Sequence, residues 1–282
     1  MDYFDGHVHF FWTGSFKSVR TKWQPLIDRG LRGIAVIIVV NNPDDIKNLL
    51  KLIPATYHDR TGDPVFFNDG SGFKISTAQN LNEDNFKVFP YLDSRFLEIK
   101  SADLAPYRDN GFKGFKILYV PEEDKELGIT GWEKFFKRSV KESEKLIIYM
   151  IEQAFSFGWP VIFHADLRKY KDFVKEVLQA YPGHPVIIPH FGSSRKIMAE
   201  FMDKYDNCYT DFSSLLPFMK RDSKKYIDFI STYNSRILFG SDTVLDEPGL
   251  TAKYYDFIAK TIADDKICKN ILSDNYKLIH GY

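Results

Sequence analysis

Three things that would restrict the location or partners of this protein are scarce in its sequence. Two cysteines, Cys208 and Cys268, stand alone among 282 residues, with neither zinc-type spacing nor the density of a disulfide-rich secreted domain. Lys plus Arg and Asp plus Glu each total 38, so no excess charge favours nucleic acid or an anionic membrane. The first residues do not follow a secretory signal pattern, and no apolar run approaches the ~20 residues of a bilayer span. We therefore expect a soluble cytoplasmic protein with a small-molecule substrate and no nucleic-acid or membrane partner; a homodimer is compatible with the sequence.

Apolar residues are plentiful and arranged in a repeating order. They make up 44% of the chain, and aromatic residues make up 16%, which is enough for a large core. Unbroken β-branched runs, such as GIAVIIVV at residues 33–40, are typical of strands buried on both faces of a parallel sheet. Eight strands are predicted, at residues 3–10, 33–40, 86–92, 112–119, 160–166, 185–192, 208–213 and 236–242. Because helical patterns alternate with them and such barrels need about 250 residues, we predict an α/β fold, a single (β/α)8 TIM barrel domain over residues 1–282.

Helices are predicted between these strands, with one long irregular stretch. The helical segments are residues 18–29, 44–53, 102–110, 169–181, 196–205, 225–233, 251–262 and 266–280, together with a long helix within residues 121–156 whose first part could instead form a lid. Residues at about 55–85 are rich in turn signals and predict an insertion. The sequence does not decide whether this insertion lies on the active face of the barrel or on the opposite one, because the second helix could be residues 44–53 or a weaker one near Ala78.

Two histidines open the chemical part of the pattern. His7 and His9 are separated by one residue in a predicted strand, so both imidazoles face the same side and could share one metal ion. Alone, the pair could equally be polar residues on a wet strand face. However, later strands also end on metal-binding residue types, namely His164, His190 and Asp242, and strand ends of a barrel converge on one mouth.

Each of these later residues also has an ordinary structural interpretation. A histidine can be a hydrogen-bonded core residue, and Asp242 could cap the following helix. Burying so many imidazole and carboxylate groups together costs several kcal/mol unless an ion or water satisfies them. The combination therefore predicts a metal site.

The motifs resemble a known family when taken in order. DGHVH at residues 5–9, VIFH at 161–164, IPHFG at 188–192 and ILFGSD at 237–242 resemble the amidohydrolase superfamily. The similarity is strongest to the amidohydrolase-related branch, which also contains decarboxylases of aromatic and muconate-type acids and several lactonases. ILSDN at residues 271–275 is similar to the closing helix of that branch.

The resemblance implies a ligand set and catalytic roles. A divalent metal would be held by His7, His9, His164 and Asp242, with His190 facing the substrate or a second metal. Asp242 would accept a proton from water and deliver it to the leaving group, and His190 would polarise the carbonyl under attack. Such ligands suit catalytic zinc, although manganese, iron and nickel stay open.

Lys116, on the fourth predicted strand, has three interpretations. In binuclear members of the superfamily a lysine on this strand is carboxylated and bridges two metals; Lys116 could instead bind a substrate carboxylate or pack its stem on the barrel. We favour one metal per chain over two. Weaker substrate-binding candidates near the predicted mouth are Arg168, Tyr119 and Asp166, and Asp93 and Arg95 also fall there.

Four functions are compatible with this set of residues. The first is a metal-dependent hydrolase that acts on a lactone, amide or ester, and the second is a metal-dependent decarboxylase of an unsaturated or aromatic acid. A TatD-type nuclease is less favoured, because the pattern of those enzymes has a glutamate on the fourth strand, where this chain has Lys116. A barrel that binds a metal without turnover is the fourth.

Overall fold

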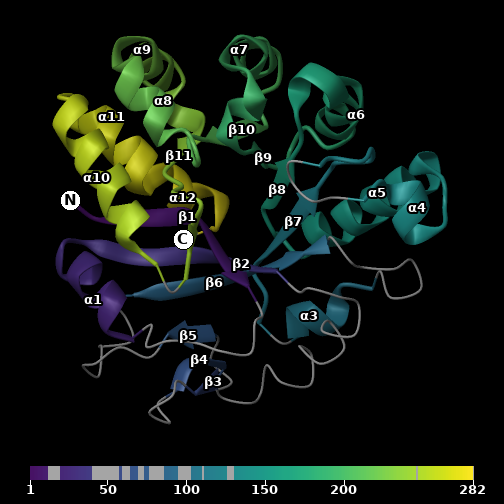
Figure 1. The fold of residues 1–282 in the computed structure, drawn as a ribbon, viewed down its shortest axis with the longest axis horizontal. Helices are drawn as coiled ribbons and strands as arrows, with labels where there is room; N and C mark the ends of the chain where they lie inside the picture. Colours follow the sequence, from purple (N-terminus) through teal and green to yellow (C-terminus); the bar gives the residue numbers. More distant parts are fainter. Residues whose placement is uncertain are drawn as a thin grey trace.

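The computed structural model describes most of the chain in ten stretches: residues 1–11, 20–39, 57–58, 64–68, 73–75, 86–94, 103–109, 111–125, 130–245 and 247–281. Within them, strands and helices alternate around a central parallel sheet (Figure 1). In this part of the chain, no helix is long and apolar enough to cross a membrane.

The central sheet contains nine strand segments, and each is parallel to its neighbours. They are β1 (Tyr3–Phe11), β2 (Leu31–Val39), β6 (Lys87–Asp93), β7 (Gly114–Leu118), β8 (Val161–His164), β9 (Val186–Ile188), β10 (Cys208–Asp211), β11 (Ile237–Leu238) and β12 (Thr243–Val244). Their order is β11-β10-β9-β8-β7-β6-β2-β1-β12.

The two outer segments of this order close the barrel. β11 pairs with β10, and β12 pairs with β1 through Val8 and Thr243. Since β11 and β12 are separated by only four residues, they are the two halves of one interrupted eighth strand. The predicted (β/α)8 TIM barrel is therefore confirmed, with the last strand broken at residues 239–242.

Helices cover the outside of the barrel, except for α12, which lies at its amino-terminal end. They are α1 (Arg20–Asp28), α3 (Ala105–Asp109), α4 (Trp132–Phe136), α5 (Val140–Ser156), α6 (Leu167–Ala180), α7 (Arg195–Lys204), α8 (Leu216–Arg221), α9 (Ser223–Thr232), α10 (Gly249–Thr261), α11 (Asp265–Lys269) and α12 (Asn275–Ile279). The long helix predicted within residues 121–156 is α5, and the short α4 precedes it. Ser139 separates the two, because its side chain and that of Glu142 form a capping box at the start of α5.

The apolar core has two layers, as the alternation of side chains along a strand requires. On β2, Ile34, Val36 and Ile38 pack outward against the helices, whereas Ala35 and Ile37 face the barrel interior. The interior layer also includes residues of α12, where Tyr276 stacks on Phe4 near the start of β1. Because α12 fills the amino-terminal end of the barrel, the opposite end is left for polar side chains.

Part of the predicted insertion forms a second sheet. β3 (Tyr57–His58), β4 (Pro64–Asn68) and β5 (Phe73–Ile75) pair antiparallel in sequence order. The helix predicted at residues 44–53 and the remaining residues of the insertion lie outside the described residues.

Candidate metal centre

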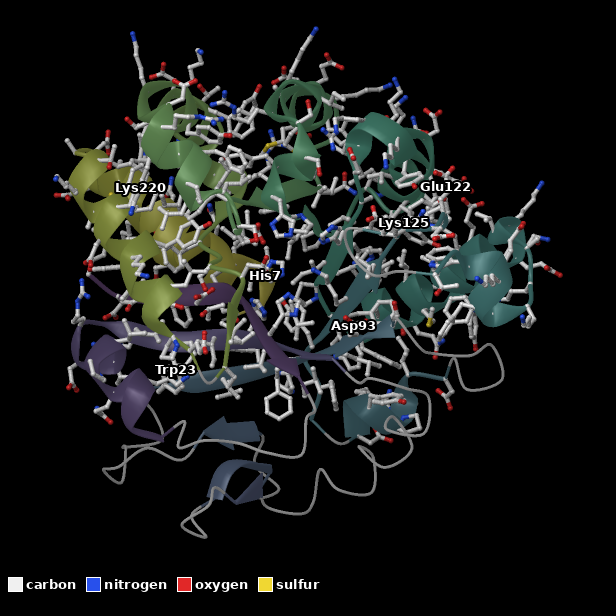
Figure 2. All side chains as sticks on the ribbon, in the orientation of Figure 1. His7, Trp23, Asp93, Glu122, Lys125 and Lys220 are labelled. Atoms are coloured by element: carbon white, nitrogen blue, oxygen red, sulfur yellow. The ribbon has the colours of Figure 1, made fainter. Side chains whose placement is uncertain are left out.

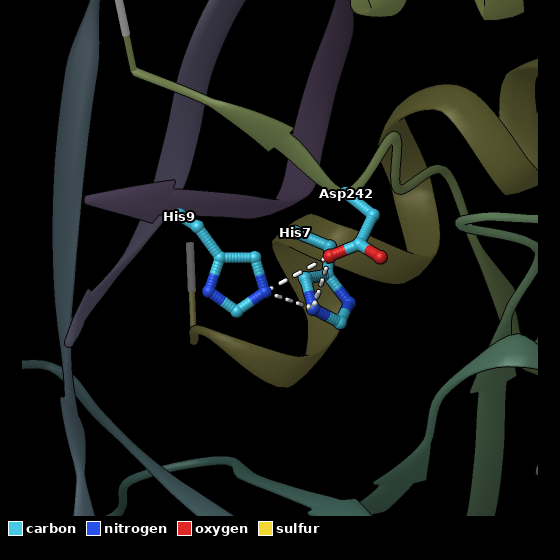
Figure 3. Close-up of side chains that lie close together, drawn as sticks. All are labelled: His7, His9 and Asp242. Atoms are coloured by element: carbon cyan, nitrogen blue, oxygen red, sulfur yellow. Dashed lines mark hydrogen bonds and ion pairs between the residues drawn. The ribbon is translucent and has the colours of Figure 1, made fainter. Parts of the chain in front are cut away.

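Three of the predicted ligands meet at the carboxyl ends of the strands (Figure 3). His9 Nε2 lies 2.9 Å from Asp242 Oδ1 and 3.2 Å from His7 Nε2, and the His7 to Asp242 distance is 3.4 Å. The two histidines share one face of β1, as their spacing predicts. Figure 2 shows His7 near the middle of the molecule, whereas Lys220 lies on the outer helices.

These distances fit the requirements of one bound cation. Ligand atoms that each bind an ion at about 2.0–2.2 Å lie roughly 3–3.5 Å from one another in tetrahedral or octahedral geometry. In the described part of the chain, the set of metal-type side chains with ligand atoms this close is His7, His9 and Asp242, all within 4.8 Å of one another. Two imidazoles and one carboxylate form a donor set that suits a divalent metal.

Asp242 reaches the histidines because the eighth strand breaks in front of it. Its backbone is left-handed, with φ 61°, and its N–H donates to the carbonyl of His7 at 2.9 Å. The preceding Gly240 allows close approach, since a Cβ there would lie 3.0 Å from the Cβ of His7. Burial alone would raise the pKa of Asp242, but the imidazoles of His7 and His9 hold it well below its usual range.

A buried carboxylate, that of Asp5, ties the first strand to this break. It accepts hydrogen bonds from the backbone and hydroxyl of Ser241, at 3.0 and 2.6 Å, from the hydroxyl of Thr251 at 2.8 Å, and from the backbone N–H of His7 at 3.1 Å. Burial raises the pKa of Asp5 to about 6, although these hydrogen bonds oppose the shift. Asp5 thus fixes the backbone on both sides of the cluster.

His7 is fully buried beside a lysine. Burial and then the positive charge of Lys116 lower the pKa of His7 to about 4. The Lys116 Nζ lies 3.4 Å from His7 Nε2, and its side chain is buried on β7. Asp93, on the neighbouring strand, is the register partner of Lys116. Lys116 therefore lies next to the cluster, in the barrel interior.

His164 and His190 lie beside the three clustered ligands. The ring of His190 is 5.3 Å from that of His7 and 5.0 Å from that of His164, between centroids. His164 ends β8 but does not belong to the set of closely spaced ligand atoms. Burial lowers the pKa of His164 well below its usual value, with Lys116 as the next cause, so the imidazole is neutral.

Asp211, the last residue of β10, and Ser213, two residues further on, complete the site, and sequence reasoning missed both. Asp211 Oδ2 lies 2.8 Å from His7 Nδ1, and the Ser213 hydroxyl lies 3.1 Å from the same nitrogen and 2.9 Å from His190 Nδ1. Burial alone would raise the pKa of Asp211, but His7 and the hydrogen bonds hold it below its usual range. Asp211 lies near the carboxyl end of the strand predicted at residues 208–213, but the sequence pattern does not indicate that its side chain points at His7.

The weaker substrate-binding candidates have other partners. Asp166 caps α6 by accepting from the backbone N–H of Arg168, and the Arg168 guanidinium binds both oxygens of Asp166, at 2.7–3.2 Å. Tyr119 is buried, stacks on Phe173 and donates to Glu144. Arg95 lies outside the described residues. These contacts of Arg168, Asp166 and Tyr119 are with one another or with Phe173 and Glu144, and a role in substrate binding stays a prediction.

The protein is thus a parallel eight-stranded α/β barrel. Imidazoles and a carboxylate, side chains of the kinds that bind metals, converge at the carboxyl end of its strands. The amidohydrolase family model matches residues 98–275, more than half of the sequence. The chain belongs to the amidohydrolase family. No curated protein matches it.

Known structures share the fold at low sequence identity. A phosphotriesterase homology protein from Escherichia coli, complexed with phosphate, is 13% identical, with a TM-score of 0.57 over 99% of this chain and 98% of that one. A putative metal-dependent hydrolase from Lactobacillus casei is 16% identical, with a TM-score of 0.51 over 99% and 95%. An uncharacterised TIM-barrel protein from Bordetella bronchiseptica is 12% identical, with a TM-score of 0.52 over 100% of both chains.

Proposed function

We propose that this protein is a metal-dependent hydrolase that acts on the carbonyl group of a small molecule, a lactone, amide or ester. The observation that carries the proposal is the convergence of His7 Nε2, His9 Nε2 and Asp242 Oδ1 at 2.9–3.4 Å from one another. Membership of the amidohydrolase family and the names of its structural neighbours support it.

The ligand set suits one divalent cation per chain, held by His7, His9 and Asp242 with His164 close by. Zinc is the favoured ion, and manganese, iron or nickel would accept the same nitrogen and oxygen donors. When bound, such a metal acts as a Lewis acid and makes a water molecule easier to deprotonate. A second ion would have to use Lys116 and His190 instead.

Asp242 is the residue to which we assign the proton transfers. Asp242 stays ionised, and its Oδ2 accepts from the hydroxyl of Ser214 while Oδ1 faces the imidazoles. It can therefore accept a proton from water and return it to the leaving group. These two transfers are the role that we assign to Asp242.

His190 has a more restricted role. Its Nδ1 lies 2.8 Å from the backbone carbonyl of Ser213, and since a carbonyl only accepts, Nδ1 carries a proton. A neutral ring then offers a lone pair at Nε2. Polarising a substrate carbonyl by donation from Nε2 would require a second proton on the ring, at Nε2.

The first experiment measures metal content and links it to these ligands. Protein purified without chelator or affinity metal is analysed for elements beside a His7→Ala, His9→Ala double variant and a His184→Gln control, which alters a histidine stacked on Phe155. We expect about one divalent metal per chain in the parent and control and none in the double variant. About two would make Lys116 a candidate for carboxylation, which intact mass would detect.

Turnover then separates the candidate reactions. A panel of lactones, amides and esters in ¹⁸O-labelled water should yield labelled acid products if the proposal holds. Release of carbon dioxide without uptake of the label would indicate decarboxylation. A parent protein that binds no zinc or manganese after reconstitution would overturn the metal-dependent function.

A further inference from the structure

We propose that Asp211 is a positioning residue that fixes the tautomer of His7 and holds His7 and His190 in one unit. The inference rests on the proposed metal site, because its consequence is the availability of His7 Nε2 as a ligand. Asp211 itself ends β10 and is 2% exposed.

The two oxygens of Asp211 face different partners. Oδ1 accepts from three donors: the backbone N–H of His190 at 3.0 Å, the backbone N–H of Ser213 at 3.0 Å and the Ser213 hydroxyl at 2.6 Å. Oδ2 faces the imidazole of His7, with Nδ1 at 2.8 Å. The two oxygens therefore have different hydrogen-bond partners, and the carboxylate cannot rotate without losing hydrogen bonds.

The contact at Oδ2 decides which nitrogen of His7 carries the proton. A carboxylate oxygen only accepts, so Nδ1 must donate and the lone pair of the neutral ring is at Nε2. That nitrogen faces His9 and Asp242. An acceptor on one ring nitrogen that prepares the other for a cation is a general feature of metal-binding histidines.

The hydrogen bonds at Oδ1 also position His190, which follows the neighbouring strand β9. His190 has a left-handed backbone, with φ 57°, at the end of β9, and its N–H is held by Asp211. The Ser213 hydroxyl, which donates to the same oxygen, lies within hydrogen-bonding distance of Nδ1 of both His7 and His190. Asp211 thus connects β1, the turn that follows β9, and the end of β10.

The variant Asp211→Asn tests the tautomer directly. Three donors converge on the position of Oδ1, so the amide oxygen must occupy it and the NH₂ group must face His7 Nδ1. That nitrogen then has to accept, which moves the proton to Nε2. In metal-free protein with ¹⁵N-labelled histidine, long-range ¹H–¹⁵N spectra should show His7 protonated at Nδ1 in the parent and at Nε2 in the variant, with the His7 signals assigned from their loss in His7→Ala.

A matched control keeps the carboxylate. Ser213→Ala removes the hydroxyl but leaves both oxygens of Asp211, so His7 should remain protonated at Nδ1. The parent spectrum is itself a test that needs no folded variant, since protonation at Nε2 there would overturn the proposal. Folded Asp211→Asn that keeps the proton on Nδ1 would also overturn it.

Zinc titration of the same proteins separates this proposal from the proposed function. We expect Asp211→Asn to bind zinc roughly 10–100-fold more weakly than the parent, and Ser213→Ala to stay closer to the parent. A switched tautomer with unchanged affinity would overturn the positioning role. If the parent binds no metal while the tautomers behave as expected, the proposed function fails but the assignment of the tautomer to Asp211 stands.

Discussion

At the scale of single residues, the site combines strained backbone with polar contacts between side chains. Ser214 and Asp242 are both left-handed, with φ 58° and 61°, and the Ser214 hydroxyl donates to Asp242 Oδ2. Left-handed backbone costs a residue with a Cβ about 1–2 kcal/mol. Strain of this kind persists where the surrounding contacts require it, and here it places a hydroxyl on the proposed proton acceptor.

Two substitutions at Ser214 separate the hydroxyl from the strain. Ser214→Ala loses the hydrogen bond and keeps the strained backbone, whereas Ser214→Gly loses the hydrogen bond and relieves the strain. We expect the glycine variant to be about 1 kcal/mol more stable than the alanine variant in urea unfolding, with turnover reduced about equally in both. A glycine variant that keeps parental turnover would show that the hydroxyl does not orient Asp242.

The residue types and the alternation of side chains along a strand predicted the three clustered ligands but not the contacts that support them. His7, His9 and Asp242 meet because barrel geometry brings strand ends together, which the sequence alone can indicate. The pairing of Arg168 with Asp166 depends on side-chain rotamers, which no sequence pattern specifies. Asp211 was missed because its role follows from one rotamer that points at His7.

At the scale of elements, the predicted strands exist, but those from the fourth to the seventh end earlier at the mouth of the barrel than predicted. The strand predicted at residues 185–192 is β9 (Val186–Ile188), followed by left-handed residues including His190, Phe191 and Gly192. The strand predicted at residues 236–242 is interrupted before Asp242. Apolar runs specify burial, but tertiary hydrogen bonds to Asp211 and Asp5 impose these turns, and periodicity carries no information about them.

Packing between neighbouring strands supplies a test of the barrel interior. A Cβ on Gly114 of β7 would lie 2.3–2.5 Å from ring carbons of the fully buried Tyr91 on β6. We therefore expect Gly114→Ala to lower the free energy of unfolding by about 1–3 kcal/mol, because the buried ring would have to shift against its neighbours. Urea unfolding measures the change.

The matched control for this clash is another glycine. Gly183 has no heavy atom within 4 Å of a built Cβ, so Gly183→Ala should leave the stability within about 0.5 kcal/mol of the parent or raise it slightly. Equal effects of the two substitutions would contradict the close packing of β6 on β7.

At the scale of the whole molecule, the two ends of the barrel have opposite chemistry. The carboxyl end holds the imidazoles and carboxylates described above, whereas α12 closes the amino end with Tyr276 and Ile279. His280, just after α12, lies among aromatic rings there, with its ring stacked on Tyr276 at 4.1 Å. This end has no part in the proposed chemistry, so its titration reports on stability alone.

His280 is bound in its neutral form. Its Nδ1 lies 2.9 Å from the carbonyl of Tyr276 and must donate, so Nε2, 2.7 Å from the Tyr91 hydroxyl, accepts. Burial lowers the pKa of His280 from 6.5 to about 4. The unfolded chain therefore binds this proton more readily than the folded protein, and the contribution to stability is complete above pH 6.5 and is lost as the pH falls towards 4.

The variant His280→Gln, whose amide cannot titrate, isolates this effect. Between pH 7.5 and pH 4.5, the parent should lose roughly 2–3 kcal/mol more unfolding free energy than the variant, measured by urea unfolding at each pH. The carboxylates elsewhere that become protonated in this pH range are common to both proteins, so their effects on stability cancel in the difference. Parallel pH profiles would mean that His280 takes up its proton without disturbing α12, and the closed amino end would then have to admit water.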